Sequence, residues 1–249
     1  MRSRGLTAWL LAFALTVVLP ASARALDHFK VYEVQKVAAS FKVQLSDQLN
    51  LPLHDATLGA ITMFANPTRK THGGVQVGIK DANAHFDWYV LNQQQVEPRR
   101  TIRFRNQFGQ SSVDIKAPRF LLVPAQKTSD AGSAFPETLD HYECYEVIAV
   151  NTVPAPPVVD LRDQFGPATH LQVGKPRYFC TPVRKVREGH PPVGIKNATD
   201  HLAVYDLPPQ PHAVSIKTRD QFGNRELKVV RSVLLAVPTE KQAAVAHSN

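Results

Sequence analysis

The chain has 249 residues, enough for one large or two ordinary domains, and 43% of them are hydrophobic, which excludes a compositionally disordered chain. Arg2, Arg4 and Arg24 lie in a segment that we expect to be removed, which lowers the net charge from +8 to +5. This mild positive charge is not typical of a nucleic-acid-binding protein, and two cysteines are too few for a disulfide-rich small domain or a four-cysteine zinc site.

Residues 1–25 have the pattern of a secretory signal peptide. Arg2 and Arg4 precede an apolar run over residues 6–19, and small residues at Ala23 and Ala25 follow it. The run is shorter than the roughly 20 residues of a spanning helix, so we favour a signal peptide over a membrane anchor. We therefore expect cleavage after Ala25 and a secreted or periplasmic protein with no membrane span after cleavage.

Four copies of one pattern fill nearly all of the remaining chain. Each copy has a histidine with a tyrosine four residues later, a D-Q-F-G-like tetrapeptide near its middle, and a closing proline with a lysine three residues later. The histidines are His28, His85, His141 and His201, the tetrapeptides begin at Asp47, Asn106, Asp163 and Asp220, and the lysines are Lys70, Lys127, Lys185 and Lys241. These landmarks define four tandem units of about 57 residues.

The units are expected to pair into two lobes. A Gly-Ile-Lys segment precedes the second and the fourth unit, whereas the joint between the second and third units is small and polar. This pattern places one lobe over residues 26–127, a linker over 128–137 and a second lobe over 138–241. A flexible tail over 242–249 would follow.

Each unit is predicted to contain three β-strands. Phe29 and Val31 fall on one face of the first strand, while His28, Lys30 and Tyr32 fall on the other. No window of ten residues has a helical period. We expect an all-β protein in which each lobe forms a six-stranded barrel or sandwich, with a single closed arrangement of twelve strands as the alternative.

The tetrapeptides are typical of hairpin turns. Asp or Asn in the first position and Gly in the fourth suit a type I turn followed by a left-handed residue. Asn50 replaces the glycine in the first unit, and Asn is the non-glycine residue that best tolerates that conformation. We therefore expect four structural turns rather than binding loops.

Cys144 and Cys180 occupy aligned core positions of the third unit. The other units place apolar residues there, namely Val31 with Ala65, Trp88 with Leu122, and Val204 with Ala236. In an oxidising compartment two neighbouring cysteines are expected to form a disulfide. A free nucleophile or a metal ligand is the alternative.

The recurring polar residues do not form a catalytic pattern. Four residues of strand span about 13 Å, so His28 and Tyr32 cannot share one metal, and we favour a half-buried histidine that bonds a backbone group. Asp163 and Asp220 resemble a carboxylate pair for glycoside hydrolysis, but turn chemistry explains them and the equivalent in the second unit is Asn106. The sequence has no G-x-S-x-G elbow, no H-E-x-x-H motif, no phosphate-cradling glycine loop and no calcium loop of the EF-hand pattern. We predict no catalytic residue, no cofactor and no metal site.

The second unit carries a locally basic group of residues, for which a solvated strand face is the ordinary interpretation. The alternative is an anion-binding site formed by Arg99, Arg100, Arg103, Arg105 and Arg119.

The motifs of the unit resemble a tandem-repeat domain of secreted bacterial proteins of uncharacterised function. That family has the pattern D-H-[FY]-x-C-Y, then D-Q-F-G, then K-P-x-x-x-C-x-P-x-x-K. The third unit matches best, at Asp140, His141, Tyr142, Cys144, Tyr145, Asp163, Gln164, Phe165, Gly166, Lys175, Pro176, Cys180, Pro182 and Lys185. The resemblance implies an exported β-domain, with a paired cysteine only in the third unit here, and supplies no activity or ligand.

We therefore expect a non-catalytic binding or structural module of the cell envelope or extracellular space, with a protein or a glycan as partner and no nucleic acid. One alternative is a secreted hydrolase with a site between the lobes. Another is polyanion or glycan binding through the basic face of the second unit.

Overall fold

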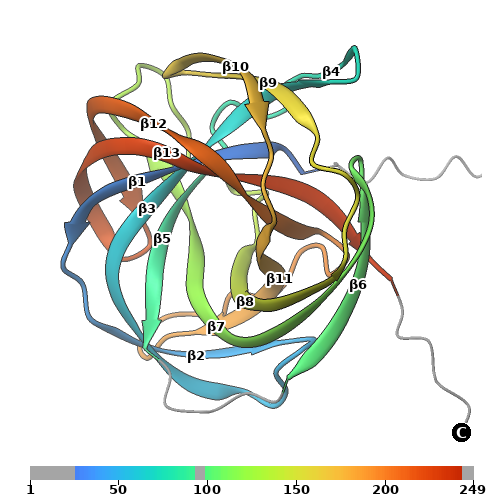
Figure 1. Cartoon of the computed structure of the whole chain (residues 1–249). Coiled ribbons are helices and arrows are strands. Elements are labelled where there is room, and N and C mark those ends of the chain that lie inside the picture. The colour runs from blue at the N-terminus through green and yellow to red at the C-terminus, as the bar shows by residue number, and fades with distance from the viewer. Residues whose placement is uncertain (1–25, 93–98, 243–249) are drawn as a thin grey trace, which may run out of the picture.

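The computed structural model describes residues 26–92 and 99–242, and their regular structure consists only of β-strands (Figure 1). The all-β prediction is confirmed. The signal peptide predicted over residues 1–25 and most of the predicted tail lie outside the described residues. No helix in the described ranges is long and apolar enough to cross a membrane.

Each unit supplies three strand segments, as predicted. The first unit forms β1 (His28–Val37), β2 (Phe41–Asp47) and β3 (His54–His72), with the short β4 (Val75–Val77) after it. The second unit forms β5 (His85–Asn92), β6 (Arg100–Asn106) and β7 (Gly109–Lys127). The third unit forms β8 (His141–Thr152), β9 (Val158–Asp163), β10 (Gly166–Gln172) and β11 (Pro176–Val186), so its last segment is interrupted. In the fourth unit β12 (His201–Asp220) covers the first two segments and β13 (Gly223–Lys241) the third.

Eight strands form a closed ring of antiparallel pairings, which we call the ring. Its order is β1, β3, β5, β7, β8, β11, β12 and β13, and β13 pairs again with β1. In Figure 1 the strands β1, β3 and β5 follow one another along one side of the molecule. Each unit therefore contributes two neighbouring strands to the ring.

The interior of the ring is an apolar core to which all eight strands contribute. It contains the aligned pairs predicted from the repeats, each directly opposite in register: Val31 and Ala65, Trp88 and Leu122, Cys144 and Cys180, and Val204 and Ala236. The two cysteines form a disulfide, as predicted. Burial of these side chains is the main source of stability of the ring.

A hairpin from each unit packs against the outer face of the ring. The hairpins are built from β2–β3, β6–β7, β9–β10 and β12–β13, and two further apolar clusters lie beneath them. Each hairpin also pairs with the unit two places away: β2 with β11, β6 with β13, β9 with β3, and the end of β12 with β7. The hairpins therefore fasten opposite sides of the ring.

The sheet continues across the boundary that the sequence places between the two lobes. β7 pairs with β8 there, and β1 pairs with β13 at the other joint. Residues 128–140 contain no strand, and the amide of Thr128 donates to the carbonyl of Lys217 at 2.8 Å. The two halves thus share one sheet, which is closer to the single closed arrangement than to two separate six-stranded lobes.

Candidate functional site

The recurring histidine, glutamine and lysine side chains meet between successive units. Gln48 donates to Nε2 of His201 at 2.6 Å and accepts a hydrogen bond from Lys241. Gln221 likewise donates to His141 at 2.5 Å and accepts from Lys185. The same contacts recur between Gln107 and His28 and between Gln164 and Lys127.

Burial keeps these histidines neutral. It lowers the pKa of His28 and of His85 to about 3, and that of His201 to about 4. The sequence predicted half-buried histidines bonded to backbone groups. The structure shows buried histidines, of which three accept from a side-chain amide. The predicted backbone bond is present at His201, whose Nδ1 lies 2.8 Å from the carbonyl oxygen of Thr199. A glutamine from the neighbouring unit bonds Nε2 of each of those three, so they serve the scaffold.

The turn acids bond both their own turn and a tyrosine of a distant unit. Oδ1 of Asp163 accepts from the amide of Phe165 at 3.0 Å, and Oδ2 accepts from the hydroxyl of Tyr32 at 2.5 Å. Asp220 makes the same two contacts, with Phe222 and Tyr89. The acids are thus occupied within the scaffold, as the turn interpretation predicts.

Three of the four turns have the predicted positive φ at their fourth position. The glycines at their fourth positions have φ values of 116° at Gly109, 113° at Gly166 and 122° at Gly223. The prediction for Asn50 is wrong, because His170 is the one non-glycine residue in the described ranges with a positive φ. Without a glycine, the first hairpin does not close after two residues but continues through a longer loop to His54.

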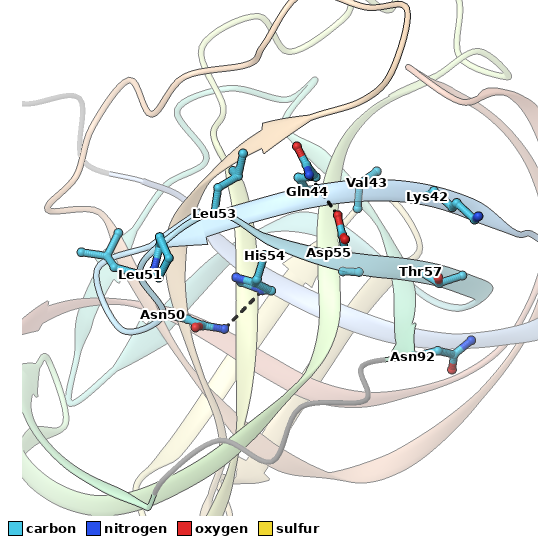
Figure 2. A pocket seen from close by; sticks show the side chains of 12 residues that line it. Lys42, Val43, Gln44, Asn50, Leu51, Leu53, His54, Asp55, Thr57 and Asn92 are labelled. Atoms are coloured by element: carbon cyan, nitrogen blue, oxygen red, sulfur yellow. Dashed lines mark hydrogen bonds between the residues drawn. The ribbon is translucent and has the colours of Figure 1, made fainter.

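This longer loop borders the cavity shown in Figure 2, which we call the groove. The groove has a volume of about 810 Å³ and lies over the β2–β3 hairpin, with Asn92 of β5 at its margin. In Figure 2 Leu51 lies at one end and Lys42 and Thr57 lie at the other. It is the place where the first unit departs most clearly from the other three.

Polar side chains line most of the groove. Gln44 donates to Asp55 at 3.0 Å, and Asn50 donates to Nε2 of His54 at 3.2 Å (Figure 2). Nε2 of His54 also lies 3.7 Å from the buried carboxylate of Glu143 in the third unit. The groove therefore offers amide, hydroxyl, ammonium and carboxylate groups to a ligand.

The position two residues after each repeated histidine is buried in every unit but carries a different residue in each. Lys30, Asp87, Glu143 and Ala203 occupy it, and all four are fully buried. Burial, together with the nearby carboxylate of Asp220, holds the pKa of Asp87 well above its usual range. Ala203 is the uncharged residue at this position in the fourth unit, and nearby Asn106, which replaces a turn acid, donates to the hydroxyl of Tyr205 at 2.8 Å.

Carboxylates lie beside three of the five arginines of the predicted anion site. Arg99 pairs with Asp114, Arg105 with Glu240 at 2.9 Å, and Arg119 with Glu146 at 3.3 Å. Arg100 and Arg103 lie in β6 as well, and Arg103 is exposed beside Arg105. Three of the five positive charges are thus partly neutralised by neighbouring carboxylates.

Sequence reasoning found the scaffold residues and missed the groove. No motif spacing in the sequence marks His54 and Asn50 as site residues, because the groove combines a widened loop with strand residues from two units. The weak signal was the absent glycine in Asp47-Gln48-Leu49-Asn50. Within the described ranges, no group of three or more histidine, cysteine or acidic side chains has a geometry that could hold a metal ion.

Residues 85–238 match the family model described as Repeat of unknown function (DUF7450). The match runs from the first strand of the second unit to the last strand of the fourth. No curated protein and no solved structure matches the chain.

Proposed function

Because the chain belongs to this family of repeats, which carries no assigned activity, we propose a function from its site: an exported, non-catalytic binding module whose groove holds a glycan. The pattern of residues 1–25 supports export to the periplasm or the extracellular space. The Cys144–Cys180 disulfide is compatible with that location. The D-Q-F-G and K-P-x-x-x-C motifs support an origin among secreted bacterial proteins.

The observation that carries the proposal is the asymmetry of the first hairpin. The repeated histidines, glutamines, lysines and turn acids bond one another and fasten the hairpins to the ring. A residue that performs this task in several units is explained by the scaffold. The groove is formed where the first unit departs from the repeat pattern. The repeated scaffold contacts therefore do not account for its lining, which favours a role in ligand binding.

The chemistry of the groove favours a hydroxyl-rich ligand. Lys42 and Asp55 carry opposite charges, so the lining has no strong preference for an anion or a cation. Asn92, Thr57 and Gln44 add neutral donors and acceptors, which match sugar hydroxyl groups. The groove lies open along a hairpin and therefore suits a segment of a longer chain.

A thermal-shift panel of bacterial and plant polysaccharides tests the proposal. A ligand that binds only the folded state stabilises it by about 2.7 kcal/mol at one hundred times its dissociation constant. We expect one glycan to raise Tm, and we expect Asn92→Ala with Gln44→Ala to abolish that rise. Arg103→Ala is the matched control, because Arg103 has the strand position of Gln44 in the second unit. A flat panel, or a rise that survives the groove variant, contradicts the proposal.

A hydrolase is the second candidate, favoured by one contact. His54 of the first predicted lobe and Glu143 of the second lie 3.7 Å apart at the groove, and a histidine oriented by a carboxylate is a common general base. Incubation of the bound glycan with the protein, followed by an assay of reducing ends, separates the candidates. New reducing ends that disappear in His54→Gln identify a hydrolase, whereas an intact glycan identifies a binding module.

A further inference from the structure

We propose that a second cavity, at one end of the ring, binds a neutral saccharide by stacking its ring on aromatic side chains. The cavity has a volume of about 450 Å³, within the range of small-molecule sites. The aromatic residues Phe120 and Tyr178 line it, together with the aliphatic residues Met63, Val233 and Leu234. It shares no lining residue with the groove, so the two proposed sites can be tested independently.

The aromatic part of the cavity is a packed cluster. The rings of Phe120 and Tyr178 lie 5.3 Å apart at an angle of 89°. Trp88 lies in the ring core next to both, 5.6 Å from Phe120 and 6.4 Å from Tyr178. Neighbouring rings that hold one another at fixed angles give a preformed surface, and a ligand that stacks on it loses little additional entropy in the protein.

Ion pairs surround the aromatic cluster. The residue that follows the repeated tyrosine is an acid in three units, and each acid pairs with an arginine: Glu33 with Arg231 at 2.6 Å, Glu146 with Arg119 at 3.3 Å, and Asp206 with Arg177 at 3.5 Å. The first and third pairs line the cavity, and Glu146 lies opposite Tyr178 in the β8–β11 register. Val90 takes this position in the second unit, beside Phe120.

This combination selects the class of ligand. Each carboxylate is matched by a guanidinium, so the rim as a whole is electrically balanced and favours neither a cation nor an anion. A paired carboxylate still accepts hydrogen bonds, and a guanidinium has five N–H donors of which a pair uses one or two. A sugar presents hydroxyl groups around its edge and an apolar face of C–H groups, which matches a polar rim around an aromatic surface.

Tryptophan fluorescence reads this site selectively. The sequence has two tryptophans, Trp9 in the predicted signal peptide and Trp88 in the aromatic cluster. The emission of the processed protein therefore comes from Trp88. Titration with cellobiose, maltose and chitobiose should give a saturable change in emission for at least one disaccharide. Tyr178→Ala should weaken that binding at least tenfold, and Arg177→Ala should weaken it several-fold.

Two controls keep the result interpretable. Tyr178→Phe retains the ring and should preserve binding, which separates stacking from damage to the fold. The groove variant Asn92→Ala with Gln44→Ala should leave the fluorescence titration unchanged, even where it abolishes the thermal shift with polysaccharides. The proposal is overturned if no disaccharide gives a saturable change, if the change survives Tyr178→Ala, or if choline gives the response and the sugars do not.

Discussion

Tyr32 donates a hydrogen bond of 2.5 Å to Asp163, although 131 residues separate them in the sequence. Tyr89 and Asp220 repeat both the distance and the separation. Both bonds run from a strand of the ring to the turn of the hairpin two units away. The packing of hairpins over the ring is therefore fixed at buried polar contacts as well as by apolar burial.

We expect removal of one of these tyrosine hydroxyl groups to lower the free energy of unfolding most where the hydroxyl bonds a carboxylate. Tyr89→Phe leaves a buried oxygen of Asp220 without its donor, and should lower the free energy of unfolding by about 1–3 kcal/mol. Tyr205→Phe is the matched control, because Asn106 keeps its hydrogen bond to Thr239 in this variant. We expect Tyr205→Phe to lower the free energy of unfolding by about 1 kcal/mol or less. Urea-induced unfolding measures both, and an equal or larger loss in Tyr205→Phe contradicts the prediction.

The buried histidines should make the protein sensitive to acid. The pKa of His28 is lowered to about 3 from 6.5, so between these values the unfolded chain binds more protons than the folded one. The contribution to stability is complete above pH 6.5 and is lost as the pH falls, by up to about 1.4 kcal/mol per pH unit for each such histidine.

Buried acids change the pH dependence of stability in the opposite direction, because the pKa values of Asp27 and Asp220 are raised in the folded protein. A histidine variant is therefore needed to separate the contribution of His28 from theirs. His28→Asn should flatten the decrease in unfolding free energy between pH 7 and pH 5, measured by urea unfolding at several pH values. His190→Asn, at an exposed turn, should leave the slope of the native protein unchanged. An identical slope in both variants would show that His28 is not the origin.

The disulfide should be replaceable by the pair that other units use. Titration of the denatured, unreduced protein is expected to find no free thiol. Cys144→Val with Cys180→Ala reproduces the Val31–Ala65 pair and should fold, with a loss of about 3–4 kcal/mol in the free energy of unfolding. Failure of this variant to fold, with Cys144→Ser and Cys180→Ser folding normally, would contradict the equivalence of the four positions.

The basic residues of the second unit should contribute little to polyanion binding. Arg105 is paired with Glu240, and the carboxylates beside Arg99 and Arg119 also reduce the local positive potential. We expect Arg103→Ala with Arg105→Ala to elute from a heparin column at the same salt concentration as the native protein. Elution at clearly lower salt would identify this face as a polyanion site.

The repeats made the interior of the ring predictable. Aligning the copies placed Trp88 against Leu122 and Cys144 against Cys180, and the strand registers confirm both. The alignment works because equivalent residues of neighbouring strands occupy equivalent levels of one ring. Alternation along a strand also identified the buried faces, since side chains point to opposite sides with a period of two.

The diagonal contacts between units were not predictable in the same way. A period of two assigns Tyr32 to a face but does not say which hairpin covers that face. Gln107 was interpreted only as part of a turn, whereas it bonds His28 of the preceding unit. The acids Glu33, Glu146 and Asp206 follow the repeated tyrosine in three of the four units. The sequence alone does not show that the fold places each of them beside an arginine.

The pairing of β1 with β13 also means that the ring can close only late in folding. Phe29 of β1 and Ala236 of β13 are partners in this sheet. One edge of β1 therefore stays unpaired until β13 has been synthesised. Contacts so distant in sequence make folding slow, because the entropy of closing a long loop is lost before the contact forms. A chain that lacks its fourth unit would present unpaired edges of β1 and β11, which are templates for aggregation. The ring is therefore complete only when all four units are present.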